Sequence, residues 1–234
     1  CIRDRVRPVS VLMDCAELGY GAIAAHGHAD CLSFVLSVGG TPVVVDAGTY
    51  DYFTHPEWRE YFRSTAAHNT LELDGKSQSI SSGPFMWSRR AQPTIQEWLV
   101  HDNETVVTGS HDGYSTEQET VIHTRRLALM KTDGRVKIVD RVDCTAAHHA
   151  VRRLHLAPGF KAFIADSGAI QITDGTITLI LEHKAADSRI VSADDKPMIG
   201  WISTGYHRRT ASSCIELSDE FAGLAEFTMT LRQA

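Results

Sequence analysis

The chain has 234 residues, of which 43% are hydrophobic and 22% are charged, and its net charge is −6. A chain of this length can bury a large core, and all-β domains of this size often stay single, so we expect one domain over residues 1–234. Acidic and basic residues are mixed along the chain, so no overall positive charge would attract nucleic acid or an anionic membrane. No apolar run approaches the roughly 20 residues of a membrane span.

The cysteines indicate neither a disulfide framework nor a thiolate zinc site, because their number is odd and no two form a C-x-x-C pair. We expect buried free thiols instead. They are Cys1, Cys15, Cys31, Cys144 and Cys214. No signal segment is visible, and the chain begins at Cys1 rather than at a methionine. We therefore expect it to be a piece of a longer protein.

The first informative stretch is "AAHGHADCLSFVLSVGGTPVVVDAGTY", residues 24–50. If this stretch is extended, His26 and His28 lie on the same side of a strand, about 7 Å apart. The alternation of apolar and smaller residues in "LSFVLSV" predicts a half-buried strand. Gly39-Gly40 predicts a hairpin turn into "TPVVVD", which ends at Asp46.

The only clear helical pattern follows, in "HPEWREYFRST". Pro56 suits the start of a helix, and Trp58, Tyr61 and Phe62 share one face at helical spacing. We predict a short helix or helical loop there. The next run, "HNTLELDG", opens with His68 and has the composition of a strand.

The rest of the chain reads as strands and hairpins. Asp-Gly occurs at residues 74–75, 112–113, 133–134 and 174–175, and three of these pairs lie between β-rich runs such as "AIQIT" and "TITLILE". Asp-Gly is typical of the type I′ turn, which needs positive φ at both central residues. Short strands without βαβ spacing predict an all-β, antiparallel β-sandwich.

Three side chains at strand ends can converge on one metal ion. They are His28, Asp46 and His68, and neighbouring strands lie about 4.8 Å apart. Two imidazoles and one carboxylate leave a fourth position open, which suits Zn²⁺ with water or a substrate oxygen. The alternative is that the three groups are separately solvated or hydrogen-bonded.

A second metal interpretation uses Asp30. His28-Ala29-Asp30 is an H-x-D, which with a distant histidine makes the two-histidine, one-carboxylate triad of a non-haem iron oxygenase on a jelly roll. His111, His148 and His149 are available as the distant ligand. Whether Asp30 or Asp46 binds metal separates the two interpretations. We expect the other histidines at the surface or in the core; they are His55, His101, His123, His155, His183 and His207.

The stretch "HGHADCLSFVLSVGGTPVVVDAGTY" followed by "WREYFRSTAAHNTLELDG" resembles the heparinase II/III-like C-terminal domain of polysaccharide lyases. The resemblance continues more weakly through "HDGY", "VIHTRRLALM" and "WISTGYH". It implies a β-sandwich that follows an α/α toroid in the complete enzyme. It also implies that His28, Asp46 and His68 are zinc ligands and that His26 is catalytic, reaching the substrate cleft.

The activity implied is β-elimination on a uronic-acid-containing glycan such as a glycosaminoglycan or alginate, in the periplasm or outside the cell. Much of the acid–base machinery of such lyases lies on the toroid, so we expect little activity from these 234 residues alone. Some relatives also use a tyrosine between the aspartate and the third ligand, where Tyr50, Tyr52 and Tyr61 are available.

Four arginines in and after the signature block can give a local basic surface for the polyanion, although for each an ordinary surface salt bridge is the competing expectation. They are Arg59, Arg63, Arg89 and Arg90. The non-enzymatic alternative is a structural or glycan-binding module whose zinc only braces the fold.

Overall fold

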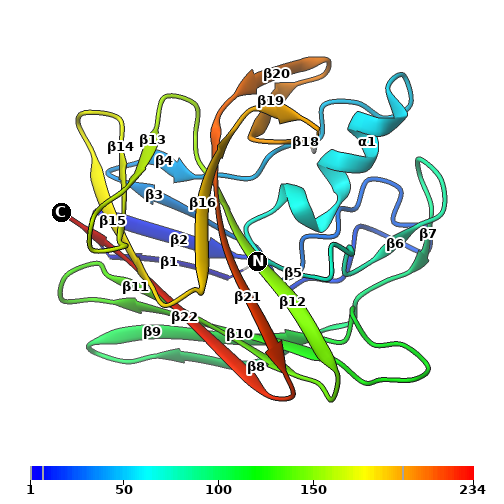
Figure 1. Cartoon of the computed structure of the whole chain (residues 1–234), viewed down its shortest axis with the longest axis horizontal. Coiled ribbons are helices and arrows are strands. Elements are labelled where there is room, and N and C mark those ends of the chain that lie inside the picture. Colours follow the sequence, from blue (N-terminus) through cyan, green and yellow to red (C-terminus); the bar gives the residue numbers. More distant parts are fainter. Residues whose placement is uncertain (1, 7, 197) are drawn as a thin grey trace.

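The computed structural model describes residues 2–6, 8–196 and 198–234, with residues 2–6 described as backbone only. It is an antiparallel β-sandwich, as the sequence predicts (Figure 1). Its described helices are α1 Pro56–Arg63 and the short 3-10 helix η1 Thr65–Ala67. None of the helices described is long and apolar enough to cross a membrane.

Three larger sheets build the sandwich. The first has the order β1-β2-β3-β4, the second β13-β14-β15-β22-β11-β10-β9-β8, and the third β16-β21-β12-β5. The first contains β1 Ile2–Val6, β2 Val9–Met13, β3 Phe34–Val38 and β4 Thr41–Val44. The second contains β8 Pro93–Val100, β9 Glu104–His111, β10 Ile122–Met130, β11 Val136–Asp143, β13 Lys161–Ile164, β14 Ile170–Thr173, β15 Thr178–His183 and β22 Ala225–Gln233. The third contains β5 Leu71–Leu73, β12 Ala147–His155, β16 Asp187–Ser192 and β21 Ser213–Ala222.

Small two-stranded sheets decorate the end of the sandwich that carries α1. They are β6 Ile80–Ser81 with β7 Trp87–Arg89, β17 Asp194–Asp195 with β18 Met198–Ile199, and β19 Trp201–Gly205 with β20 Arg208–Ala211. The signature block of the sequence spans β3, β4, α1 and β5 together with the irregular connections between them.

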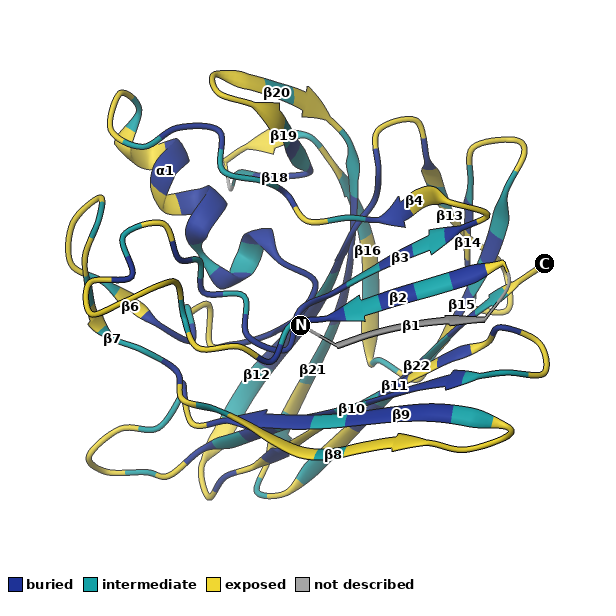
Figure 2. Cartoon of the chain, turned by 180° about the vertical axis from the view of Figure 1, so that it is seen from behind, coloured by how far each residue is buried: buried dark blue, intermediate teal, exposed yellow. Residues whose placement is uncertain are grey.

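One apolar core is shared by all three larger sheets. It combines Phe34 and Leu36 of β3 with Ile138 of β11 and Leu154 of β12. Side chains in β2 and β3 alternate between buried and half-buried, as the sequence pattern predicts, whereas the outer strand β8 is mostly exposed (Figure 2). Full burial of each large apolar side chain contributes roughly 1.5–3 kcal/mol to folding, so this core is the main source of stability.

The hairpin turns follow the predicted chemistry only in part. Gly39-Gly40 joins β3 to β4 with φ of 61° and 90°, and Asp74-Gly75 also has two positive φ values, 53° and 65°. Asp133-Gly134 and Asp174-Gly175 close hairpins through longer loops, so the prediction of a two-residue type I′ turn is wrong there. In both loops the aspartate carboxylate accepts the N–H of the residue two positions on, Arg135 or Thr176. This local bond favours a different turn.

The predicted helix is confirmed as α1. Pro56 lies in its first turn, and Trp58, Tyr61 and Phe62 are buried on its inner face. They pack with Tyr50 and Ile202 in a second apolar cluster. This cluster fixes α1 at the end of the sandwich, beside the loops that carry the candidate site.

Candidate metal centre

His26 and His28 lie in the loop between β2 and β3 and not in an extended strand, so the strand geometry predicted for them is wrong. The loop turns sharply, with Gly27 N–H donating to the Ala24 carbonyl at 2.9 Å. Glycine at position 27 allows a close approach of the chain, because a Cβ there would lie 2.6 Å from Leu18 Cδ2 and 3.0 Å from the Gly19 backbone nitrogen. The two histidines consequently face different surroundings.

Buried polar side chains hold this loop against the segment after α1. Asn69 donates to the Phe34 and Val45 carbonyls at 2.9 and 2.8 Å, which links β3 to the end of β4. Thr65 and Gln78 both donate to the Ala29 carbonyl, at 2.8 and 2.7 Å. No role was predicted for these three side chains from the sequence, although "HNT" belonged to the quoted motif.

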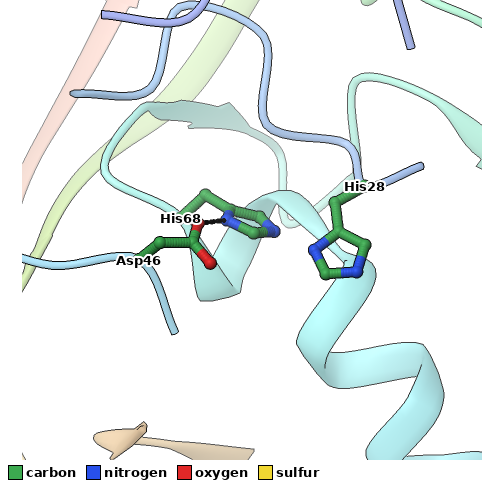
Figure 3. Close-up of side chains that lie close together, drawn as sticks. All are labelled: His28, Asp46 and His68. Atoms are coloured by element: carbon green, nitrogen blue, oxygen red, sulfur yellow. Dashed lines mark hydrogen bonds and ion pairs between the residues drawn. The ribbon is translucent and has the colours of Figure 1, made fainter. Parts of the chain in front are cut away.

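These clamps bring His28, Asp46 and His68 together. Their possible ligand atoms all lie within 4.8 Å of one another, and the two imidazole centroids are 5.2 Å apart. His68 Nδ1 is 2.7 Å from Asp46 Oδ2, while Asp46 Oδ1 accepts the Gly48 N–H at 2.8 Å. Figure 3 shows His68 between the carboxylate and the His28 ring.

Burial and mutual charge set the protonation states of the cluster. Burial and the neighbouring His68 lower the pKa of His28 to about 3, so its imidazole is neutral at neutral pH. Burial alone would lower the pKa of His68, but the Asp46 carboxylate outweighs it and raises that pKa. Desolvation opposes a charged Asp46, yet the charge and hydrogen bond of His68 hold the pKa of Asp46 below its usual value.

Two buried nitrogens in this cluster have no hydrogen-bond partner among the described residues. They are Nε2 of His28 and Nε2 of His68. Burying an unpartnered polar atom costs roughly 1–3 kcal/mol, and a metal ion would satisfy both. The set of two imidazoles and one carboxylate fits Zn²⁺, with Asp46 either binding the ion or orienting His68 from behind.

Asp30 does not belong to this group. Within the described part of the chain, the metal-ligand group built on His28 contains Asp46 and not Asp30. Burial raises the pKa of Asp30 to about 7, so a large fraction of it is a neutral acid near neutral pH. Of the two aspartates, it is therefore Asp46 that lies within 4.8 Å of the ligand atoms of His28 and His68.

His26 is exposed and lines the same cavity as His28 and Asp46, with a volume of about 430 Å³. Its ring packs edge-on against Tyr52, 5.2 Å between centroids, and against Phe85 at 6.1 Å. The structure therefore separates the half-buried His28, which lies beside the carboxylate, from the exposed His26, which lies beside a tyrosine.

Of the three candidate tyrosines, only Tyr52 lies against His26. Tyr50 is buried in the cluster around α1, where its hydroxyl accepts a hydrogen bond from Arg209 at 3.2 Å. Tyr61 is also buried, and desolvation raises the pKa of its hydroxyl. Both of these side chains serve packing.

Arg59 and Arg63 are almost fully buried. The expected salt bridge is present for Arg63, whose partner is an exposed glutamate, and it is absent for Arg59 among the described residues. Arg63 pairs with Glu60 at 2.5 Å. Arg59 donates only to the Pro84 and Ala25 carbonyls, both at 3.3 Å, and its Nη1 has no partner within the described residues. Its guanidinium lies 5.1 Å from the centre of the Tyr52 ring.

The other two candidate arginines donate to backbone carbonyls. Arg89 contacts the Gly113 and Ser115 carbonyls, and Arg90 contacts the Ala22 carbonyl. They fasten loops to one another, whereas Arg59 lies against the Tyr52 ring.

The remaining histidines divide between core and surface. His123 and His155 are fully buried, and His111 is buried beside His123 with 3.0 Å between Nε2 and Nδ1. The others are half-buried or exposed, namely His55, His101, His148, His149, His183 and His207.

Comparisons with known proteins give one family and one fold. A family model described as heparinase II/III-like, C-terminal, matches residues 2–228. The heparan sulfate lyase HepC from Pedobacter heparinus is similar in structure, with 16% sequence identity, a TM-score of 0.77, and coverage of 96% of this chain and 33% of that one. A structure titled heparinase III, BT4657 gene product with methylated lysines, has 16% identity, a TM-score of 0.76, and coverage of 99% and 34%. No curated protein sequence matches the chain.

At these identities the structural likeness shows a shared fold. A further structure titled heparinase III agrees, at 13% identity, a TM-score of 0.77, and coverage of 97% of this chain and 33% of that one. The chain thus spans about a third of the length of these lyases.

Proposed function

Because the chain belongs to the heparinase II/III-like C-terminal family of polysaccharide lyases, we propose that it is the β-sandwich domain of a lyase that cleaves uronic-acid-containing glycans by β-elimination. In this reaction a base removes the C5 proton of a uronate and the oxygen at C4 leaves, which gives an unsaturated sugar. The C5 proton is weakly acidic. The enzyme must therefore neutralise the carboxylate and supply a positioned base and acid.

The observation that carries the proposal is that His26 and His28 lie two residues apart in different surroundings. His28 and His68 present buried, unpartnered nitrogens next to Asp46, and these three residues would hold Zn²⁺. When bound, the zinc would mainly tie three distant segments together and so stabilise the fold. His26, two residues away, is left free to face the glycan.

The chemical role falls to His26 with Tyr52 and Arg59. An imidazole can act as a general acid or base, so His26 can exchange a proton with the sugar or help to neutralise its carboxylate. Tyr52 lies against His26 and has a hydroxyl suited to proton transfer to the leaving oxygen. The Arg59 guanidinium beside Tyr52 has no carboxylate partner within the described residues, so its positive charge favours an anionic sugar at this place.

An N-terminal α/α toroid is the proposed partner. The chain spans about a third of the related lyases, and we assign much of the carboxylate binding and proton transfer to the part that it does not span. Holding these groups in register is worth several kcal/mol of barrier. A periplasmic or extracellular location, where polymeric glycans are available, belongs to the same proposal.

The test is a lyase assay on a full-length enzyme with heparan sulfate, chondroitin sulfate, hyaluronan and alginate. Elimination makes a conjugated product that absorbs in the ultraviolet, so we expect absorbance to rise with at least one of these polyuronates. The 234-residue chain alone should give little or none. Glycan binding by the full-length protein without any absorbing product would instead favour a structural or glycan-binding module.

A further inference from the structure

A second group of possible metal ligands lies outside the site described above and shares no residue with it. Glu119 is in the connection between β9 and β10, Cys144 directly follows β11, and His148 is in β12. Their ligand atoms all lie within 4.8 Å of one another. A thiolate, an imidazole and a carboxylate are all side chains that bind zinc in proteins.

His148 is oriented as metal-binding histidines usually are. Its Nδ1 lies 2.9 Å from Asp74 Oδ2, and Asp74 Oδ1 accepts the His149 N–H at 3.0 Å. Metal-ligating imidazoles commonly give their other N–H to such a carboxylate, which fixes the ring and its tautomer. His148 Nε2 is then directed inward, where it is buried, lies 3.3 Å from Glu119 Oε2 and has no hydrogen-bond partner within the described residues.

Glu119 is held in place through one of its two carboxylate oxygens. Its Oε1 accepts three hydrogen bonds, from Thr145 N and Ala146 N at 2.7 Å and from Thr145 Oγ1 at 3.0 Å. These donors, first the Ala146 N–H and then the Thr145 N–H, lower the pKa of Glu119 to about 2. The carboxylate is therefore charged at neutral pH, and Oε2 faces the His148 nitrogen.

Cys144 completes the set as a buried thiol. Its Sγ donates to the Gly223 carbonyl at 3.0 Å, and burial raises the pKa of the thiol. A bound cation would reverse that preference, because a thiol coordinates as the thiolate. Binding would release the thiol proton to solvent, with no change in oxidation state.

We propose that Cys144, His148 and Glu119 bind a divalent cation of borderline softness, Zn²⁺ by the chemistry of the donors. Thiolate sulfur and imidazole nitrogen select zinc over magnesium or calcium, which prefer sets made only of oxygen. Glu119 and His148 also line a cavity of about 490 Å³, from which a water molecule can supply a fourth ligand. The ion would fasten the β9–β10 connection to the turn between β11 and β12.

Cobalt(II) is a suitable probe because thiolate-bound Co²⁺ has a charge-transfer band in the near ultraviolet, whereas the His28, Asp46 and His68 site has no sulfur. The reduced, metal-free chain would be titrated with Co²⁺. We expect the thiolate band in the wild type. We expect Cys144→Ser to lose the band and to bind one equivalent of Co²⁺ fewer.

Cys214→Ser is the matched control, since Cys214 is also buried and its Sγ lies 3.9 Å from His155 Nε2. This variant should keep the band. His148→Gln, which retains the side-chain volume approximately, should lose the band while Cys144 is intact, so the proposal stays testable if Cys144→Ser does not fold. No thiolate band in the wild type, or a band that survives in folded Cys144→Ser or His148→Gln, would overturn the proposal.

Discussion

Two histidine–aspartate pairs in this protein have the same nitrogen–oxygen distance but differ in their other contacts. His68 lies 2.7 Å from Asp46 at the end of the sandwich, and His123 lies 2.7 Å from Asp140 between two strands of the large sheet. Both imidazoles are fully buried. The second nitrogen of His123 reaches His111 at 3.0 Å, whereas the second nitrogen of His68 has no partner within the described residues.

The Asp140 network is complete in itself. Arg125 donates to both carboxylate oxygens of Asp140, at 2.7 and 2.9 Å, and to the Leu32 and Asn69 carbonyls at 2.9 and 2.6 Å. Asn69 follows His68 in the chain, and its side chain links β3 to the end of β4. The Arg125–Asp140 network therefore holds the residue next to His68 in place. A buried network whose members all have partners can support a neighbouring site, whereas an unpartnered buried nitrogen indicates where a ligand could bind.

The largest effect should follow loss of the proposed zinc at the incomplete pair. His28→Ala removes one of the two unpartnered nitrogens, so the protein should lose one equivalent of zinc and melt at a lower temperature. An ion present at 1,000 times its Kd contributes about 4 kcal/mol to stability. Metal analysis and thermal melting check this. Unchanged zinc content in His28→Ala, or Asp30 rather than Asp46 at the metal, would contradict the assignment.

Mutation of the His123–Asp140 pair should lower the stability of the protein without changing its metal content. Asp140→Asn leaves the Arg125 guanidinium buried without a carboxylate, which typically costs about 3 kcal/mol or more. We expect denaturant unfolding to show this loss and the zinc content of the folded protein to stay unchanged. A lower zinc content in the folded Asp140→Asn variant would mean that the Asp140 network and the metal-ligand group depend on each other.

Low pH should remove the stabilisation that the Asp140 network provides. Burial opposes the charge of Asp140, but Arg125 and His123 outweigh it and hold the pKa of Asp140 below its ordinary value. Since the folded pKa is depressed, the stabilisation is complete above the ordinary value of about 3.9 and is lost as pH falls below it. The stability difference between wild type and Asp140→Asn should therefore shrink as pH falls below about 4, as urea unfolding at each pH would show.

His26 should separate chemistry from stability. In a full-length enzyme, His26→Ala should lower kcat by about 10²-fold, the scale of a lost acid–base group, equivalent to about 2.7 kcal/mol of barrier. Zinc content and melting temperature should stay near wild type because the side chain is exposed. The proposed division of labour is wrong if this variant loses its metal or keeps full turnover.

Much of this fold could be predicted because local rules decide it. Alternation fixed β3, Pro56 and three aromatic residues fixed α1, and the order of His28, Asp46 and His68 anticipated their convergence. The turn at Gly39-Gly40 followed for the same reason, since positive φ at both residues is a property of the turn itself.

What could not be predicted depends on distant contacts. The loop of His26 and His28 is bent because Gly27 packs against Leu18, a contact that no period in the sequence reveals. An arginine in this sequence context is expected at the surface, and Arg59 is buried because the distant segment at Pro84 lies beside it. The group of Glu119, Cys144 and His148 was not predicted. A cysteine four residues before a histidine is a weak sequence signal, and nothing in the sequence connects this pair to the distant Glu119.

The smallest effect tests whether an unpartnered buried atom always marks a site. Thr105 Oγ1 in β9 is buried without a hydrogen-bond partner among the described residues, and Thr105 belongs to neither metal-ligand group. Thr105→Val removes the unsatisfied hydroxyl and keeps a β-branched side chain in the strand, so stability should be unchanged or higher by up to about 1 kcal/mol. Thr108→Val is the matched control on the same strand, because Thr108 Oγ1 donates to Glu97 Oε2 at 3.0 Å, and it should lose a few tenths of a kcal/mol up to about 1. Urea unfolding of both variants measures the contrast. Equal destabilisation by the two would show that the Thr105 hydroxyl has a partner, and that the missing bonds of His28 and His68 are by themselves insufficient grounds for a metal.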